Sequence, residues 1–143
     1  GQTDTGRLEI EVLDHRGHRP IRLSLAEDGR VRVATAEGIV EVGPYRASEW
    51  LRFSLTLDTT AAKFDLALNG QKLVSAATFA EAAATVERLS LRTGAFRLEP
   101  TRQTDRYAVL DDLPDPDKPV PPAVFYLDEV VIEDASGSTR ARR

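Results

Sequence analysis

Hydrophobic and polar residues alternate along most of the chain, so that every second side chain is apolar. The first example is the stretch Leu8-Glu9-Ile10-Glu11-Val12. Successive side chains of a β-strand point to opposite faces of a sheet, so this pattern predicts strands with one buried and one exposed side. Helical spacing is sustained almost nowhere. The pattern therefore predicts an all-β fold.

Turn signals divide the alternating stretches into short strands. Asp28-Gly29 and Asn69-Gly70 are the clearest, because both dipeptides favour the positive φ angles of tight hairpins. Trp50 is expected to open the most regular strand, with the apolar side chains from Leu51 to Leu57 pointing inward. The alanine-rich stretch 79–84 is too short and uncapped for a major helix. Strands are expected within residues 8–12, 21–25, 31–33, 39–42, 50–57, 64–68, 73–74, 86–91 and 124–132.

The domain is expected to span residues 1–135, followed by a flexible basic tail at 136–143. Residues 95–123 form a long polar connection within it, and five prolines between positions 114 and 122 exclude a central strand there. Loops of this length are usually functional or mobile.

The composition is that of one ordinary globular domain and excludes several classes of function. Of the 143 residues, 41% are hydrophobic, yet no apolar run approaches the roughly 20 residues of a membrane span. A net charge of −4 argues against nucleic-acid binding, which needs a clustered positive surface. Cysteine is absent, so disulfides and thiolate metal sites are excluded. Because the chain begins at Gly1 rather than Met, we expect a processed or excised piece. Such a piece is compatible with secretion, and we expect an extracellular or periplasmic location.

Four stretches together resemble the concanavalin A-like lectin and glucanase domains, also called laminin-G-like jelly rolls. They are residues 49–58 (EWLRFSLTLD), 64–70 (FDLALNG), 89–94 (LSLRTG) and 124–132 (VFYLDEVVI). The resemblance is to modules attached to bacterial carbohydrate-active enzymes. It implies a two-sheet antiparallel sandwich with a noncatalytic carbohydrate-binding or interaction role in a larger secreted polysaccharide-processing protein.

The chain departs from this family in lacking strands that complete members contribute before the position where it starts. An exposed edge strand invites pairing with another strand. We therefore expect a sheet edge that another chain, another domain or a removed segment completes. A structural sandwich that packs against such a partner is the second functional hypothesis.

Arginine and tyrosine side chains at polar strand positions form the first candidate site, a glycan-binding face. Guanidinium groups are strong donors to hydroxyls, carboxylates and sulfates, and an aromatic ring is a platform for a sugar. The alternative is that these side chains only keep a solvent-facing sheet soluble. The candidate ligand-binding residues are Arg52, Arg88, Arg92 and Tyr126.

Asp128 in the last expected strand is the candidate ligand of a structural calcium ion, a site that the resemblance implies. Calcium takes six to eight oxygen ligands, of which one aspartate supplies one or two. The alternative is a hydrogen-bonded strand carboxylate.

Glu9, Glu11 and Asp14 loosely resemble the acidic strand motif of glycosidases that share this fold, with the Asp and Glu positions exchanged. Two carboxylates on one strand face suit a retaining mechanism, which makes a glycoside hydrolase or polysaccharide lyase the third hypothesis. The alternative is an acidic face on an exposed strand. The two histidines, His15 and His18, are expected at a solvated hairpin tip rather than in a metal site.

Overall fold

The structure is a computed structural model that describes residues 6–93 and 123–134, together with the backbone of residues 139–140. Strands are its only regular elements within these ranges, so no helix there is long and apolar enough to cross a membrane. Most of the predicted connection 95–123, and the predicted tail apart from the backbone of 139–140, lie outside the described residues.

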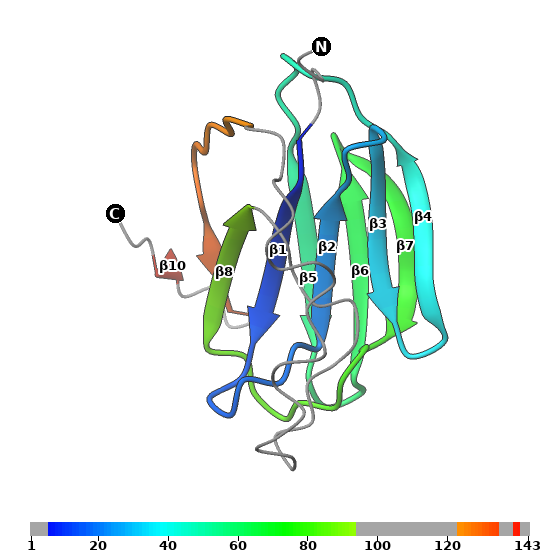
Figure 1. The fold of residues 1–143 in the computed structure, drawn as a ribbon. Coiled ribbons are helices and arrows are strands. Elements are labelled where there is room, and N and C mark those ends of the chain that lie inside the picture. The colour runs from blue at the N-terminus through cyan, green and yellow to red at the C-terminus, as the bar shows by residue number, and fades with distance from the viewer. Residues whose placement is uncertain (1–5, 94–122, 135–138, 141–143) are drawn as a thin grey trace, which may run out of the picture.

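Five antiparallel strands form the larger sheet, in the order β4-β3-β2-β1-β8 (Figure 1). Chain neighbours pair through short hairpins from β1 to β4, and β8, which follows the three strands of the second sheet, pairs with β1. The strands are β1 (Leu8–Leu13), β2 (Ile21–Leu25), β3 (Arg30–Thr35), β4 (Gly38–Pro44) and β8 (Arg88–Thr93).

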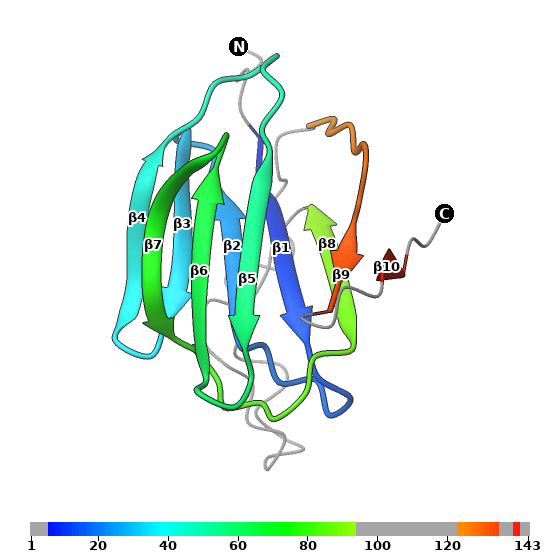
Figure 2. The ribbon, with the colours of Figure 1, turned by 180° about the vertical axis from the view of Figure 1, so that it is seen from behind.

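A second antiparallel sheet, in the order β5-β6-β7, lies behind the first and is seen from its own side in Figure 2. Its strands are β5 (Phe53–Asp58), β6 (Lys63–Leu68) and β7 (Gln71–Thr78). A two-stranded ladder joins β9 (Ile132–Glu133) and β10 (Thr139–Arg140). The prediction of an all-β protein with two packed antiparallel sheets is confirmed.

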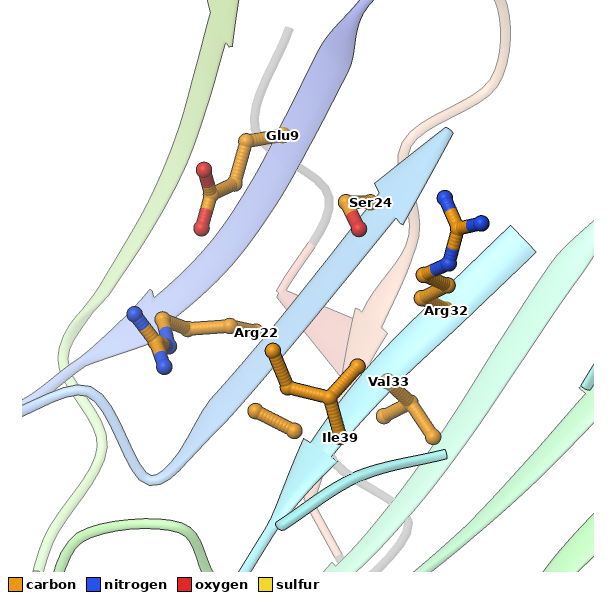
Figure 3. A pocket seen from close by; sticks show the side chains of 7 residues that line it. Glu9, Arg22, Ser24, Arg32, Val33 and Ile39 are labelled. Carbon is orange, nitrogen blue, oxygen red and sulfur yellow. The ribbon is translucent and has the colours of Figure 1, made fainter. Parts of the chain in front are cut away.

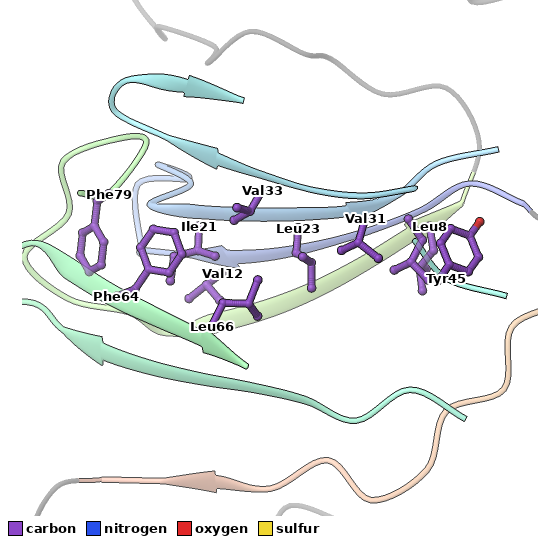
Figure 4. Packing of buried hydrophobic residues seen from close by; sticks show 11 residues of the cluster. Leu8, Val12, Ile21, Leu23, Val31, Val33, Tyr45, Phe64, Leu66 and Phe79 are labelled. Carbon is purple, nitrogen blue, oxygen red and sulfur yellow. The ribbon is translucent and has the colours of Figure 1, made fainter. Parts of the chain in front are cut away.

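The core lies between the two sheets and consists of the apolar side chains that alternation turns inward (Figure 4). Ile21, Leu23 and Leu66 are completely buried, and Phe64 on β6 packs against Phe79 with ring centroids 6.4 Å apart. Burial of an aliphatic or aromatic side chain contributes about 1.5–3 kcal/mol, so this layer holds the sheets together.

The Asn69-Gly70 hairpin forms as predicted. Asn69 (φ 51°) and Gly70 (φ 83°) both adopt the left-handed conformation, and they join β6 to β7. Gly29, with φ 75°, makes the turn between β2 and β3 in the same way.

Two details of the strand prediction are wrong. Trp50 was expected to open a strand, but it lies outside β5, which begins at Phe53, and its side chain is 70% exposed. The expected strand 124–132 is not formed, because residues 123–131 pair with no other described strand and β9 contains only Ile132–Glu133. Glu129 interrupts this stretch with a positive φ of 49°. Stretches of alternating hydrophobic and polar residues therefore form strands here only where a neighbouring strand supplies hydrogen bonds.

Candidate functional site

Polar side chains form a continuous row across the outer face of the five-stranded sheet. The register places Glu9 opposite both Arg92 on β8 and Ser24 on β2, Ser24 opposite Arg32, and Arg32 opposite Glu41. Cβ atoms of directly opposed residues lie about 5 Å apart, so charges of opposite sign and a hydroxyl alternate along the row. We call this row, together with Glu11 and Arg22 beside it, the polar face.

Glu9 is the most unusual residue of the polar face, because it is only 2% exposed. Burial, together with the nearby Glu11 carboxylate, raises the pKa of Glu9 to about 7, although Arg22 and Arg92 act in the opposite direction. Its Oε2 atom accepts no hydrogen bond from the residues that the structure describes. A buried acceptor without a donor is costly, so this atom can accept a hydrogen bond from a ligand or a water molecule.

Glu11 joins the arginines around Glu9 into one network. Its Oε1 atom accepts hydrogen bonds from Arg19, at 3.0 Å, and from Arg92, at 2.8 Å. The Glu11 side chain is 4% exposed, whereas that of Arg92 is 44% exposed. Arg92 is therefore anchored at one nitrogen and still presents part of its guanidinium group to solvent.

A small hollow opens beside Glu9 on the polar face (Figure 3). Its volume of about 20 Å³ has room for one water-sized group. The carboxylate of Glu9 can accept a hydrogen bond, the guanidinium groups can donate, and the Ser24 hydroxyl can do both. The hollow is lined by Glu9, Arg22, Ser24, Arg32, Val33, Ala34 and Ile39.

The four candidate glycan-binding residues divide between two parts of the molecule. Arg88 and Arg92 lie on the same face of β8, where Arg88 donates to the backbone oxygen of Asp14 at 3.2 Å. Arg52 precedes β5 in the other sheet and donates to Glu129 Oε2 at 3.0 Å. Tyr126, 78% exposed, lies in the segment before β9. Of these four residues, only Arg92 is paired with the row of the polar face, opposite Glu9, whereas Arg52 and Arg88 both line the larger groove described below.

Asp128 is exposed and lies beside Glu129 in the segment before β9. Within residues 6–93 and 123–134, no three His, Cys, Asp or Glu side chains converge in a way that fits a metal ion. The calcium ion at Asp128 therefore stays a prediction.

The three carboxylates considered for catalysis have separate surroundings. Glu9 and Glu11 share one face of β1 as predicted, but the alternative expectation of an exposed acidic strand is wrong, since both are buried. Asp14 Oδ1 accepts from the backbone N–H groups of Arg16 and His18, both at 2.8 Å, and its Oδ2 bonds His18 Nδ1 at 2.7 Å. Burial alone would raise the pKa of Asp14, yet these hydrogen bonds lower it to about 2. Asp14 thus stabilises the turn between residues 14 and 18 through these hydrogen bonds.

A larger groove of about 610 Å³ lies on the side of the sandwich where β5 and β8 are the edge strands. Apolar side chains of β1, β5 and β8 line it, and residues 127–133 border its mouth. It has the volume of a small-molecule site, but most of its lining is aliphatic. Beyond the expected open edge, no pattern in the sequence pointed to this groove.

The two packed antiparallel sheets define a β-sandwich domain. The family model of the sialidase-like CBM domain, where CBM denotes a carbohydrate-binding module, matches residues 1–108. The chain belongs to this family. The predicted carbohydrate-binding β-sandwich module is thereby confirmed.

A solved structure titled "Sialidase" is also similar to this chain, with 30% sequence identity and a TM-score of 0.60. The match covers 81% of this chain but only 10% of that chain. No curated protein matches the sequence.

Proposed function

We propose that the chain is a noncatalytic module that holds a larger glycan-processing protein on its substrate by binding a sugar at the polar face. The family match supports carbohydrate binding, and the match to one tenth of a sialidase chain supports a larger parent of that kind. The proposal includes a concanavalin A-like jelly-roll topology and an extracellular or periplasmic location, where such glycans are found.

The observation that carries the proposed position is the unpartnered Oε2 atom of Glu9 beside the hollow. A sugar hydroxyl is about the size of a water molecule and donates one hydrogen bond. It therefore fits the hollow and supplies the donor that Glu9 lacks.

Glu9 also indicates that the sugar unit at the hollow is neutral rather than acidic. Arg32 at the hollow is already paired with Asp28 and Glu41, whereas Glu9 Oε2 lacks a donor. A sugar hydroxyl supplies that donor, but an ionised carboxylate or sulfate only accepts hydrogen bonds. Arg92, half-exposed and anchored by Glu11, supplies a donor for a second hydroxyl at the rim.

The test is a glycan array followed by calorimetry on the ligands found, with variants that address the hollow and the rim separately. Ser24→Val fills the hollow with a side chain suited to a strand, and Arg92→Ala removes the rim donor. Each is expected to weaken binding about tenfold or more, as loss of a hydrogen bond to a charged group does. Lys72→Ala is the matched control, because Lys72 also forms a surface ion pair, with Asp65 at 2.9 Å, but on the other sheet.

Circular dichroism and thermal melts of each variant separate lost binding from lost folding. Full binding by folded Ser24→Val and Arg92→Ala proteins would exclude the polar face as the site. Loss of binding in Arg52→Ala instead would place the site beside the three-stranded sheet.

The large apolar groove favours a second candidate function, packing against another part of a larger protein. This function does not compete for the polar face, because the groove opens between the two sheets rather than on the outer side of one.

A further inference from the structure

The sandwich is open on one side. β5 is an edge of the three-stranded sheet and β8 is an edge of the five-stranded sheet, and neither pairs with a further strand among the described residues. The apolar groove lies between these edges. Inward-facing side chains that a complete second sheet would cover are consequently only partly buried, including Leu55 and Leu57 on β5 and Leu91 on β8.

The segment at residues 123–133 borders the groove but does not fill it. Phe125 packs against the core, but the apolar side chains that follow it are exposed, with Leu127 at 59%, Val131 at 54% and Ile132 at 58%. Figure 4 shows the segment running next to the three-stranded sheet on the far side of β5 from β6, and Arg52 reaches Glu129 across the intervening space. In the part of the chain that the structure describes, no strand lies between β5 and this segment.

The groove lies between β5 and the segment that ends in β9, and the directions of these two stretches determine how a strand between them would have to run. β5 and the segment that ends in β9 run the same way in Figure 2. Strand pairs within the two large sheets are all antiparallel. A single strand running in the opposite direction pairs antiparallel with both borders, and its alternate side chains point into the groove.

We propose that the groove is a docking site for one extended β-strand contributed by another part of the larger protein, which inserts between β5 and residues 124–132. The strand carries apolar, β-branched or aromatic residues at every second position, because its inner face meets Ile10, Leu89 and Leu91. Main-chain hydrogen bonds to the β5 edge provide affinity, and the apolar groove provides selectivity. This role is independent of sugar binding.

The size of the similar protein supports a larger protein as the source of the strand. The chain matches only 10% of the solved sialidase, so the rest of such a protein offers many segments at high effective concentration. A docked strand would also remove the exposed β5 edge, which otherwise invites aggregation.

The experiment fuses a donor strand to the full chain and follows hydrogen exchange. The probe is the peptide Lys-Val-Thr-Val-Thr-Val-Lys, joined before Gly1 by a flexible Gly-Ser linker. The control fusion carries proline in place of both threonines, which keeps the valines but removes backbone donors. A second control combines the first fusion with Val131→Asp, a change at a 54% exposed side chain that the fold without a docked strand tolerates.

In the unfused chain, the β5 amides that do not bond to β6 are expected to exchange rapidly. The donor fusion is expected to slow them at least about tenfold and to shift Trp50 fluorescence to the blue, whereas both controls leave them fast. If the proline fusion slows exchange of the β5 amides equally, apolar contact alone explains the effect, and strand pairing is refuted. Slow exchange of these amides in the unfused chain would also overturn the proposal, since residues 124–132 or a second copy would then occupy the site. Sedimentation would separate these two cases, because a second copy makes a dimer and residues 124–132 leave a monomer.

Discussion

Glu9→Gln provides a direct test of the buried carboxylate on which the polar face depends. Burial and the Glu11 carboxylate raise the pKa of Glu9 from its ordinary value of 4.5 to about 7. Because the folded value lies above the unfolded one, protonated Glu9 stabilises the fold below pH 4.5, and this contribution is lost as the pH rises through about 7. A shift of this size corresponds to about 3 kcal/mol at 1.36 kcal/mol per pH unit.

The amide that replaces the carboxyl group in Glu9→Gln cannot ionise, so the variant lacks this loss. The free energy of unfolding of Glu9→Gln, relative to that of the wild type, is therefore expected to rise by about 3 kcal/mol between about pH 4 and about pH 8. Urea unfolding followed by circular dichroism measures it, and taking the difference removes the contribution of histidines that both proteins share. Glu37→Gln at an exposed turn shows how much a surface substitution alone changes the curve. A difference that stays constant with pH would refute the assignment of a buried, ionisable Glu9.

Three further substitutions test the fold itself, at one turn of each sheet and in the core. Asp14→Ala removes the acceptor of three hydrogen bonds in its turn and is expected to lower the melting temperature. Because the pKa of Asp14 is lowered to about 2, the extra stability of the wild type is present above pH 3.8 and shrinks as the pH falls through about 2. Thermal melts of both proteins at acidic pH would show this loss. Gly70→Ala is expected to cost about 1 kcal/mol in urea unfolding, because φ is 83° while nothing lies within 4 Å of the added methyl group, and a larger loss would indicate a clash instead. Phe64→Ala, at a side chain 1% exposed, is expected to cost about 3–5 kcal/mol, and a loss below about 1 kcal/mol would contradict the packing of the core.

The sequence predicted the fold class and most strands because their signals are local. Alternation over five or six residues decides which face of a strand is apolar, and Asn69-Gly70 allows the backbone angles of its hairpin without help from distant residues. These features agree with the structure at β1, β2, β5 and β6.

The burial of Glu9 and Glu11 was missed because it depends on charges brought from other strands. A single acidic strand looks solvent-facing, whereas the sheet places Arg22 and Arg92 next to these two carboxylates. A signal was present: the arginines of residues 22 and 32 alternate with apolar residues as regularly as the glutamates do. Comparison of the glutamates on one expected strand with the arginines on the next two would have predicted that their side chains share one face of the sheet.

The segment 124–132 failed as a strand for the opposite reason. Its residues have the composition of a buried strand, yet hydrogen bonds to a neighbour decide whether a strand forms, and that neighbour is not specified by the segment itself. Trp50 shows the same dependence at the start of β5, where pairing with β6 begins only at Phe53.

The central position of β1 explains how one small sandwich can serve both proposed surfaces. Glu9 and Glu11 point to the polar face, while Ile10 and Val12 on the same strand line the groove on its other side. A shift of one residue in the register of β1 would exchange these two sets and destroy both surfaces at once. Pairing with β2 on one side and β8 on the other fixes that register through eleven residue pairs, five with β2 and six with β8. The polar face is therefore expected to keep its geometry whether or not a strand occupies the groove, because β1 is already paired on both sides and the proposed strand would pair with β5 instead.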